Sequence, residues 1–515
     1  MNQGLLQDAV IICGQDDPIG VAKIDLPSGS LLAVRGGQVL ALEMIPRGQR
    51  IALKDIPAGV WVVQYGYPFA RSLGIKAGAL VSNRNTENAV PDVDWARYQA
   101  PPVTVLDPGL ASRTFQGFRR LDGRIGTRNY YLVVPASMCA SETALQVARR
   151  IDESRLFHWR YPRVDGVVAI PHSEGCGCDS GLPIDRLLKV LKGYITHPNV
   201  GGCLVMDMGC EQTDCDRIQS FLKQASALSS KPVDWVSIQK SGGSVASRKA
   251  AQRVIARRLP EVNRFFREPV SVAGLVVGTE CGASDAFSGI TANPLIGAVA
   301  DRVVQAGGAA VLTEVTEMIG TLPMLLRRFR SAELARKFQG LIDWYEDMAR
   351  RLGVSLTPNL VPKNIEGGLI NNVVKSLGAV MKGGTTAIED VLDYADRVKR
   401  PGLSIMQGPG NDPESVTGLA AGGVNIILFS TGQGTTTGDA IVPVIKIATT
   451  HELFRRLPKD MDVDAGRLLD PGASVNALGD ELFERVIRVA SGQRTWSERW
   501  KQRQFQIWTV GKLSL

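Results

Sequence analysis

A chain of 515 residues, 21% charged and 44% hydrophobic, is long enough for two to four domains with well-buried cores and is unlike a disordered or fibrous protein. Its net charge of +8 suits an anionic small-molecule substrate, but the basic residues are scattered and not interleaved with aromatic residues, which disfavours a nucleic-acid partner. The sequence has neither a ~20-residue apolar run nor a signal-peptide pattern, so we expect a cytoplasmic protein with no membrane partner. In that compartment its eight cysteines are expected to bind metal, react or pack, and not to form disulfides.

The N-terminal part of the chain is predicted to be a small β domain. Short alternating runs between residues 9 and 85 are separated by Pro-Arg-Gly, Pro-Ala-Gly and Lys-Ala-Gly turn signals at regular spacing. We assign residues 1–86 to this domain. Residues 87–114 contain paired prolines and no periodicity, which is typical of a linker that lies along the surface of its neighbours.

From residue 115 onward, strand-length apolar runs alternate with amphipathic helical patterns, which is typical of parallel βαβ units. The helical patterns include a long stretch at 332–352 and a closing helix at 480–491. We divide this part into a first α/β domain, residues 115–267, and a C-terminal α/β catalytic domain, residues 268–515. The expected fold class is therefore α/β, with a small N-terminal β domain and a large body of Rossmann-like parallel sheets.

Three glycine-rich loops that follow predicted strands each contain a cysteine. These loops are Pro171–Gly181 with Cys176, Met208–Cys215 with Cys210, and Gly278–Pro294 with Cys281. Because the ends of neighbouring parallel strands converge on one crevice, we expect the three cysteines to lie in one crevice at the carboxyl ends of adjacent strands. The alternative is that three buried cysteines only pack.

Several long segments resemble the altronate/galactarate dehydratase family. They include FQGFRRLDGRIGTRN (115–129), HSEGC (172–176), MGCE (208–211), ECGASDAFSGITANP (280–294), LTEVTEMIG (312–320), KSLGAVMKGG (375–384), PGND (409–412), LFSTGQGTTTG (428–438) and PVIKIAT (443–449). The N-terminal region is similar to the SAF-type β-clip domain at the head of these enzymes. Within the family, the chain looks more similar to altronate dehydratase than to galactarate dehydratase.

The resemblance implies a hydro-lyase, acting as a homo-oligomer such as a dimer, that uses iron to dehydrate an anionic sugar acid to its 2-keto-3-deoxy product. Removal of a proton next to a carboxylate is difficult without a Lewis acid, which explains the need for a metal. Cys176, Cys210 and Cys281 could hold a [4Fe–4S] cluster by three thiolates. They could instead lie beside a mononuclear Fe²⁺ with oxygen and imidazole ligands, and Glu211 is a further candidate ligand. Both forms of iron stay open.

Polar side chains in the matching segments are the candidate catalytic and substrate-binding residues. His172 is a candidate base or ligand, although it could equally cap a strand end. Lys446 lies inside an apolar run, where it is either catalytic or an edge-strand lysine that faces water. Glu280, Asp285 and Glu314 are candidate metal ligands or bases. The candidate substrate contacts are Arg128, Asn129, Ser284, Asn411, Thr431, Gly432 and Gln433.

The chain also departs from the family pattern. Cys13 replaces a histidine that is expected to reach the active site from the head domain, and Gln433 replaces an arginine. Ala283 replaces a glycine, Val374 replaces an acidic residue, and Val361–Gly368 replaces a Ser-Pro-Gly-Asn turn. These changes leave two alternatives open: a lyase that acts on another hydroxy acid, such as sulfolactate, and a non-catalytic relative that binds sugar acids.

Overall fold

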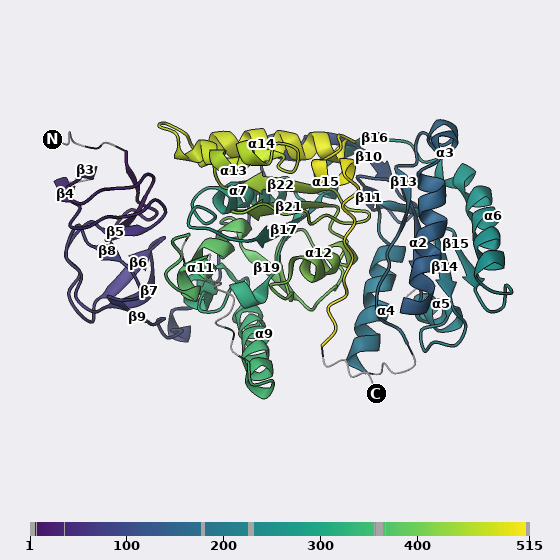
Figure 1. Ribbon diagram of the computed structural model, residues 1–515, viewed down its shortest axis with the longest axis horizontal. Helices are drawn as coiled ribbons and strands as arrows, with labels where there is room; N and C mark the ends of the chain where they lie inside the picture. Colours follow the sequence, from purple (N-terminus) through teal and green to yellow (C-terminus); the bar gives the residue numbers. More distant parts are fainter. Residues whose placement is uncertain are drawn as a thin grey trace.

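The computed structural model describes residues 6, 8–34, 37–176, 181–224, 231–354, 356, 364–365 and 367–510. In Figure 1 a small β domain lies at one end of an elongated molecule, a large α/β unit occupies the middle, and a smaller α/β unit lies at the other end. The expected fold class is thereby confirmed. Within the described ranges, none of the helices combines the length and apolar composition that a membrane crossing requires.

The N-terminal domain consists of short strands that form three small sheets, ordered β1-β2-β5-β8, β3-β4 and β6-β7-β9. The strands are β1 (Val10–Ile11), β2 (Ile19–Ala22), β3 (Leu31–Val34), β4 (Gly37–Leu40), β5 (Arg50–Ala52), β6 (Trp61–Gln64), β7 (Tyr67–Ser72), β8 (Leu80–Val81) and β9 (Thr86–Asn88). One of its hydrophobic clusters is completed by Leu369, Ile370, Val374 and Leu377 of the large unit. The domain is therefore joined to the body by a shared core.

The segment between the β domain and the body has little regular structure, as the prolines predict. It contains the short helices η1 (Trp95–Arg97) and α1 (Pro108–Ala111). Tyr98 donates its hydroxyl hydrogen to Phe329 O, and Arg330 donates to Pro101 O. The segment thus runs along the large unit.

The smaller α/β unit is a four-stranded parallel sheet in the order β13-β12-β14-β15. Its elements are β12 (Tyr130–Pro135), α2 (Met138–Asp152), α3 (Arg155–Arg160), β13 (Gly166–Ala169), α4 (Leu182–Ile195), β14 (Val200–Asp207), α5 (Cys215–Gln224), β15 (Val233–Ser237) and α6 (Ser244–Val262). Helices α2 and α6 share one hydrophobic cluster, and α4 belongs to another that extends into the large unit. At Gly193 of α4 a Cβ would lie only 2.2 Å from Ala421 O, so glycine permits this close contact between the units.

The large unit is a seven-stranded parallel sheet in the order β19-β20-β18-β17-β21-β22-β23. Its strands are β17 (Val276–Gly282), β18 (Ala309–Leu312), β19 (Ile388–Leu392), β20 (Gly402–Met406), β21 (Ile426–Thr431), β22 (Val444–Ala448) and β23 (Val463–Asp464). The α-helices are α7 (Ala292–Gln305), α8 (Leu322–Leu325), α9 (Ala332–Arg351), α11 (Asn372–Ala379), α12 (Asp412–Ala421), α13 (His451–Arg456), α14 (Val475–Ala490) and α15 (Trp496–Arg499). The 3₁₀ helices are η2 (Val272–Gly274), η3 (Val315–Glu317), η4 (Leu326–Arg328), η6 (Val380–Gly383) and η7 (Ala465–Leu469). Most central strands are buried along their whole length, which explains their continuous apolar runs.

Two further connections hold the α/β units together. The first is an antiparallel sheet in the order β11-β10-β16, formed by β10 (Thr114–Arg119), β11 (Ile125–Gly126) and β16 (Glu268–Ser271). The second is the segment 500–510, which runs from α15 down between α12 and α4 in Figure 1. Lys501 forms an ion pair with Asp152 of the small unit, and Gln506 N donates to Thr417 Oγ1 of the large unit. This segment therefore ties one unit to the other.

Candidate active site

The carboxyl ends of three adjacent strands bring acidic side chains and a thiol together. Cys281 lies near the end of β17, Glu314 follows β18, and Asp412 follows β20 as the first residue of α12. Strands β20, β18 and β17 are neighbours in the sheet, so their exits meet at one edge. In open α/β sheets this edge is where ligands bind.

The contacts around Cys281 define a compact group of side chains. Its Sγ lies 3.3 Å from Glu317 Oε2, 3.7 Å from Glu314 Oε1 and 2.8 Å from Lys382 Nζ. Lys382 also donates to Glu314, and Lys375 Nζ lies 2.7 Å from Glu317 Oε1. We call these residues, together with Glu280 and Asp412, the Cys281 cluster.

The cluster has more acidic groups than cations. Four carboxyl groups and one thiol face two lysines, and Cys281, Glu314 and Lys382 are at most 3% exposed. Burial, and then the Glu314 carboxylate, raise the pKa of Glu280 and of Cys281. Burial lowers the pKa of Lys382, but the surrounding thiol and carboxyl groups outweigh burial and raise it, so Lys382 stays charged at neutral pH.

Asp412 has a pKa close to neutrality. Burial raises it to about 7, and the neighbouring carboxylates of Glu314 and Glu317 add to the effect. The side chain is half-buried and stands at the N-terminus of α12, where Asn411 caps the helix. A carboxyl group with this pKa exchanges protons readily at neutral pH.

Two backbone features show that this edge of the sheet is held in an unusual conformation. Glu314 has φ 66° and ψ 54°, in the left-handed region, and its carboxylate accepts a hydrogen bond from Cys281 N. Ala283 has φ 47°. Non-glycine residues are uncommon in this region and cluster at functional sites. A left-handed turn of this kind favours glycine, which is the residue expected at position 283 from the resemblance, and alanine adopts it here under strain.

The residues of the Cys281 cluster fit a metal ion. The ligand atoms of Cys281, Glu314 and Glu317 all lie within 4.8 Å of one another. Glu280 Oε1 is buried and has no hydrogen-bond partner among the described residues, which is uncommon for a buried carboxyl group. A divalent cation would offset the acidic excess. The mixed thiolate and carboxylate donors suit a first-row metal such as Fe²⁺.

Cys176 and Cys210 lie in the other α/β unit, beyond the carboxyl ends of β13 and β14. The expectation that the three cysteines follow adjacent strands is therefore wrong, because β17 belongs to the seven-stranded sheet and β12 separates β13 from β14. Glu211 accepts hydrogen bonds from the backbone N–H groups of residues 208, 209 and 210, and from Ser137 Oγ. Its carboxylate orders the Cys210 loop, and its role as a metal ligand stays a prediction.

His172 lies in the small unit and uses both ring nitrogens. Nε2 lies 2.9 Å from Pro135 O, and Nδ1 accepts a hydrogen bond from Glu174 N. These contacts agree with the alternative of a histidine that caps a strand end. A catalytic role for His172 stays a prediction.

The remaining residues of the Cys281 loop divide into two groups. Ser284 Oγ lies 3.8 Å from Cys281 Sγ, at the edge of the cluster. Asp285 instead accepts hydrogen bonds from Phe287 N, from Ser288 N and Oγ, and from Thr449 Oγ1. Burial raises the pKa of Asp285, and its contacts order the turn that follows Cys281.

Arg128 and Asn129 are buried between structural elements. Arg128 forms a bidentate ion pair with Glu498, at 2.6 and 2.8 Å, and also donates to Val489 O. Asn129 donates to Arg163 O and Val262 O. Both side chains therefore hold elements together, and the structure gives no contact between either of them and the Cys281 cluster within the described residues.

Lys446 lies on β22, an interior strand, and is fully buried. The alternative of an edge-strand lysine that faces water is therefore wrong. Its ammonium donates to Thr435 O and Gln502 Oε1, and burial lowers its pKa to about 8. At the end of β21, Thr431 Oγ1 accepts a hydrogen bond from Gly434 N, Gly432 packs against Asp285, and the Gln433 side chain is exposed.

Two further departures from the expected family pattern, Cys13 and Val374, have defined surroundings. Cys13 is half-buried beside Gln64, and burial raises its thiol pKa to about 12. Tyr65, the neighbour of Gln64, packs against Gly289, where a Cβ would lie 2.4 Å from the tyrosine hydroxyl. Val374 is buried in the core that the N-terminal domain shares with α11, which explains an apolar residue there. Residues 361–363 and 366 of the predicted loop lie outside the described residues.

Sequence reasoning missed four members of the cluster: Glu317, Lys375, Lys382 and Asp412. All four lie in segments that had been singled out for their resemblance to the family. The exits of β18 and β20 follow the same strand-exit rule that identified Cys281, so that rule could have found Glu317 and Asp412. The two lysines lie within the helices α11 and η6 and do not follow a strand, so only the packing of these helices brings them to the cluster.

Comparison with known proteins agrees with the geometry. Three family models match consecutive parts of the chain: the altronate/galactarate dehydratase SAF domain over residues 8–89, the second domain of D-galactarate dehydratase/altronate hydrolase over residues 117–263, and the C-terminal domain of D-galactarate/altronate dehydratase over residues 272–513. Altronate dehydratase of Escherichia coli is 33% identical over 499 residues, which is 96% of this chain and 98% of that protein. Galactarate dehydratase (L-threo-forming) of the same organism is 31% identical over 479 residues, 89% of this chain and 88% of that protein. The β subunit of (2R)-sulfolactate sulfo-lyase of Chromohalobacter salexigens is 32% identical over 405 residues, 77% of this chain and 98% of that subunit.

Proposed function

The chain belongs to the altronate/galactarate dehydratase family, and from this we propose that it is a hydro-lyase that converts a sugar acid to its 2-keto-3-deoxy product at the Cys281 cluster. The observation that carries the assignment of the site is the buried excess of acidic groups at the carboxyl ends of three adjacent strands. We expect the enzyme to act in the cytoplasm. We also expect it to form a homodimer, and light scattering would measure the mass of the oligomer.

The reaction has two demands that side chains can meet. The C2–H bond breaks and its electron pair forms the C2=C3 double bond, while the C3–O bond breaks and the hydroxyl leaves as water after it gains a proton. The enol that results tautomerises to the 2-keto product. The site must therefore move protons at two neighbouring carbons and stabilise negative charge on the substrate carboxylate.

In this proposal Asp412 is the proton-transfer group, because it is a carboxyl group of the cluster that lies outside the proposed metal ligands, at the exit of β20, and burial raises its pKa above the usual range. Lys382 stays charged and buried, so it stabilises negative charge and does not act as a base. Lys375, paired with Glu317, supplies a second cation at the same edge. Two fixed cations beside a carboxylate lower the barrier to removal of the neighbouring proton.

The metal that the family implies is proposed to be a mononuclear Fe²⁺ bound by Cys281, Glu314 and Glu317. When bound, it would act as a Lewis acid toward the substrate carboxylate and the leaving hydroxyl. A [4Fe–4S] cluster is less well supported, because such clusters are held by several cysteines. In this chain Cys176 and Cys210 come from a different sheet than Cys281.

The test is anaerobic purification followed by metal and sulfide analysis and a screen of altronate, galactarate and sulfolactate for 2-keto product. We expect iron without sulfide, turnover of a sugar acid, and loss of both iron and turnover in Cys281→Ser. Cys210→Ser serves as the matched control and should keep its iron. Loss of iron in Cys210→Ser, or the presence of labile sulfide, would favour the cluster; turnover of none of the three acids would contradict the proposed function.

A further inference from the structure

Arg50 of the N-terminal domain is a fully buried cation without a counter-charge. It lies on β5 and, within the described residues, forms no ion pair. Its guanidinium donates to Gln64 Oε1 at 3.1 Å, to Gly48 O at 3.3 Å and to Gly368 O, and among the described residues Nη2 has no partner. Burial lowers the pKa of the guanidinium, and no carboxyl group offsets this effect. A cation buried without an anion is costly, so what Arg50 contributes to the fold are its three hydrogen bonds.

Two of these bonds join the N-terminal domain to the body. Gly48 belongs to the domain, whereas Gly368 belongs to a turn of the body in which Gly368 N donates to Ile365 O. We call Asn364, Ile365, Gly367 and Gly368 the Gly368 turn. A Cβ at Gly368, where φ is 100°, would lie 2.2 Å from Gly48 O, so the two backbones are in contact. One guanidinium therefore binds both carbonyls where the two parts of the chain meet.

The Gly368 turn also holds the loop that follows Cys281. Gly367 O accepts a hydrogen bond of 3.0 Å from Ala286 N, and Asn364 Nδ2 donates to Ser284 O at 2.6 Å. Ser284 is the loop residue whose Oγ lies 3.8 Å from Cys281 Sγ. The contacts of Arg50 thus reach the edge of the Cys281 cluster through a single turn.

The N-terminal domain touches the same loop directly. The Arg47 guanidinium lies 5.0 Å from the centre of the Phe287 ring, and the Tyr65 hydroxyl packs against Gly289. Tyr65 has φ 59°, in the left-handed region, and Asp17 accepts a hydrogen bond from its backbone N–H at 2.8 Å. A strained residue of this kind persists where the surrounding structure fixes it, so Tyr65 is held firmly against the loop.

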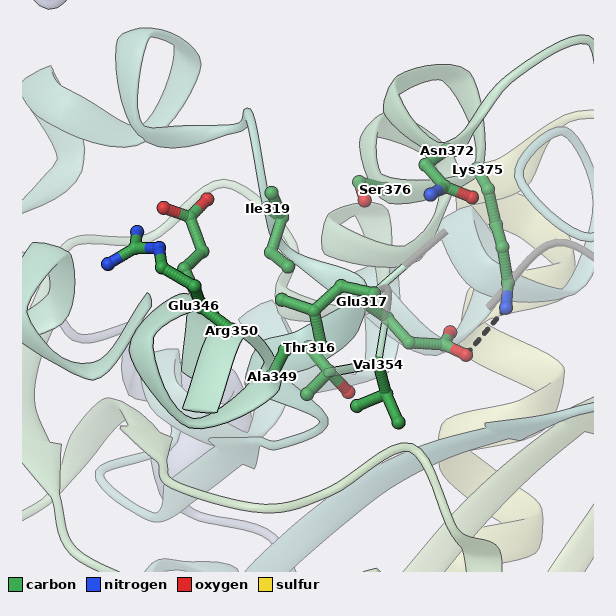
Figure 2. Close-up of a pocket in the computed structure, with 11 residues that line it drawn as sticks. Thr316, Glu317, Ile319, Glu346, Ala349, Arg350, Val354, Asn372, Lys375 and Ser376 are labelled. Atoms are coloured by element: carbon green, nitrogen blue, oxygen red, sulfur yellow. Dashed lines mark hydrogen bonds and ion pairs between the residues drawn. The ribbon is translucent and has the colours of Figure 1, made fainter. Parts of the chain in front are cut away.

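Helix α11 is the second element near the cluster that the N-terminal domain supports. Val374 of this helix belongs to the shared core, and Gly378 lies beside the Tyr65 hydroxyl. Figure 2 shows Lys375 of the same helix reaching Glu317. The domain therefore packs against both the loop and the helix that flank the cluster.

The loop depends on such contacts because the sheet does not fix it. Cys281 lies within β17, and Glu314 and Glu317 follow β18 directly, so the backbones of the proposed metal ligands are held by the sheet and its exits. Ser284 lies beyond the end of β17, outside any helix or strand, and follows the strained residue Ala283. The position of Ser284 is therefore more sensitive to the Gly368 turn than the positions of the proposed metal ligands are.

We propose that Arg50 is a positioning residue, which holds Ser284 in place beside the Cys281 cluster by fixing the Gly368 turn. The inference rests on the proposed function, in which Ser284 is a candidate substrate contact at the edge of the cluster. Arg50 acts through the turn and needs no contact with the substrate. Without it the loop shifts, and the substrate meets Ser284 in the wrong place.

The kinetic test is Arg50→Met, which removes the donors and keeps an unbranched side chain. A displacement of about 1 Å at a substrate contact costs about a hundredfold in rate, so kcat/KM for the sugar acid should fall about tenfold to a hundredfold, with a rise in KM. A purely structural defect would reduce the fraction of folded enzyme, which lowers the apparent kcat and leaves KM unchanged. Bound iron should stay the same, because other elements hold the proposed metal ligands.

Two further variants make the test specific. Arg71→Met is the matched control, because Arg71 is another arginine of the N-terminal domain that donates to a backbone carbonyl, that of Gly59, at 2.8 Å. It should leave KM unchanged. Asn364→Ala breaks the same chain of contacts at its far end and leaves Arg50 in place. It should raise KM as Arg50→Met does, and the double variant should be no worse than the more affected single variant.

Amide hydrogen exchange separates this inference from the proposed function, because it needs no turnover. Peptides that cover residues 284–287 should exchange about tenfold faster in Arg50→Met and Asn364→Ala than in wild type and Arg71→Met. Unchanged exchange, an unchanged KM, or additive effects in the double variant would overturn the inference, and Asn364→Ala decides alone if Arg50→Met does not fold. Faster exchange in the variants, combined with an iron-loaded wild type that turns over no sugar acid, would refute the proposed function and leave the positioning of the loop standing.

Discussion

Replacing Asp412 by asparagine is expected to make the protein more stable at neutral pH and nearly inactive. The folded state raises the pKa of Asp412 from 3.8 to about 7, because burial and the carboxylates of Glu314 and Glu317 disfavour its ionised form. Between these two values the folded protein binds more protons than the unfolded chain does, so stability falls as the pH rises through this window. Asparagine cannot ionise and removes that loss.

The size of the effect follows from the pKa shift. A pKa shift of about three units lowers the free energy of unfolding by about 4 kcal/mol at most above pH 7, since each unit is worth about 1.36 kcal/mol. Because a half-buried group can relax toward water, we expect a difference of about 2–4 kcal/mol between the two proteins. At about pH 4 the same comparison should give almost no difference. The variant should also lose about 10²- to 10⁴-fold in kcat, as is typical for removal of a proton-transfer group.

The assay is urea unfolding of the metal-free wild type and Asp412→Asn at several pH values between 4 and 8.5, with Asp343→Asn as an exposed control. The difference in the free energy of unfolding between wild type and Asp412→Asn should grow with pH, and the control should show none. A difference that is independent of pH would refute the raised pKa. Full activity of Asp412→Asn, with an unchanged pH profile, would refute its role in proton transfer.

Three further predictions concern the site. Lys382→Met should lower the free energy of unfolding by about 3–5 kcal/mol, because it leaves the buried Glu314 carboxylate without its cation; an unchanged urea midpoint would contradict this. Anaerobic Fe²⁺ at about 100 times its Kd should stabilise the wild type by about 2.7 kcal/mol, seen as a higher Tm, and should stabilise Cys281→Ser far less; equal Tm shifts would place the iron elsewhere. Wild type should prefer altronate to galactarate, and Gln433→Arg should raise the relative kcat/KM for galactarate about tenfold to a hundredfold. Cys13→His should raise turnover. Kinetics that show no change in either variant would argue against a role for these two positions.

Local patterns in the sequence predicted individual elements well. The amphipathic stretch 332–352 is α9, which spans Ala332–Arg351, and the run before Cys281 is a strand. The predicted closing helix at Asp480 starts earlier, at Val475, because Ser474 caps it through Ala477 N. These features depend on residues near one another in the chain, which is where periodicity and capping rules apply.

The division of the strands between two sheets could not be predicted in the same way. β10 pairs with β16, about 150 residues later, and no periodicity in either strand identifies its partner. For the same reason Cys176 and Cys281 looked equivalent, since each follows an apolar strand. The two lysines of the cluster could not be found from the sequence either, because a lysine in a helical segment is usually solvated. Only tertiary packing brings Lys382 to Cys281.

The segment 500–510 has a consequence for how this protein is made and handled. A ribosome releases the strands of both sheets before it releases segment 500–510, so this tie between the two units forms only after synthesis has passed residue 510. Nascent chains stalled earlier would lack Ile507 and Trp508, which are buried in the core that both units share. For the same reason, a truncation or inserted reporter near residue 500 should give a protein prone to aggregation, whereas an affinity tag before residue 6 leaves this latch intact.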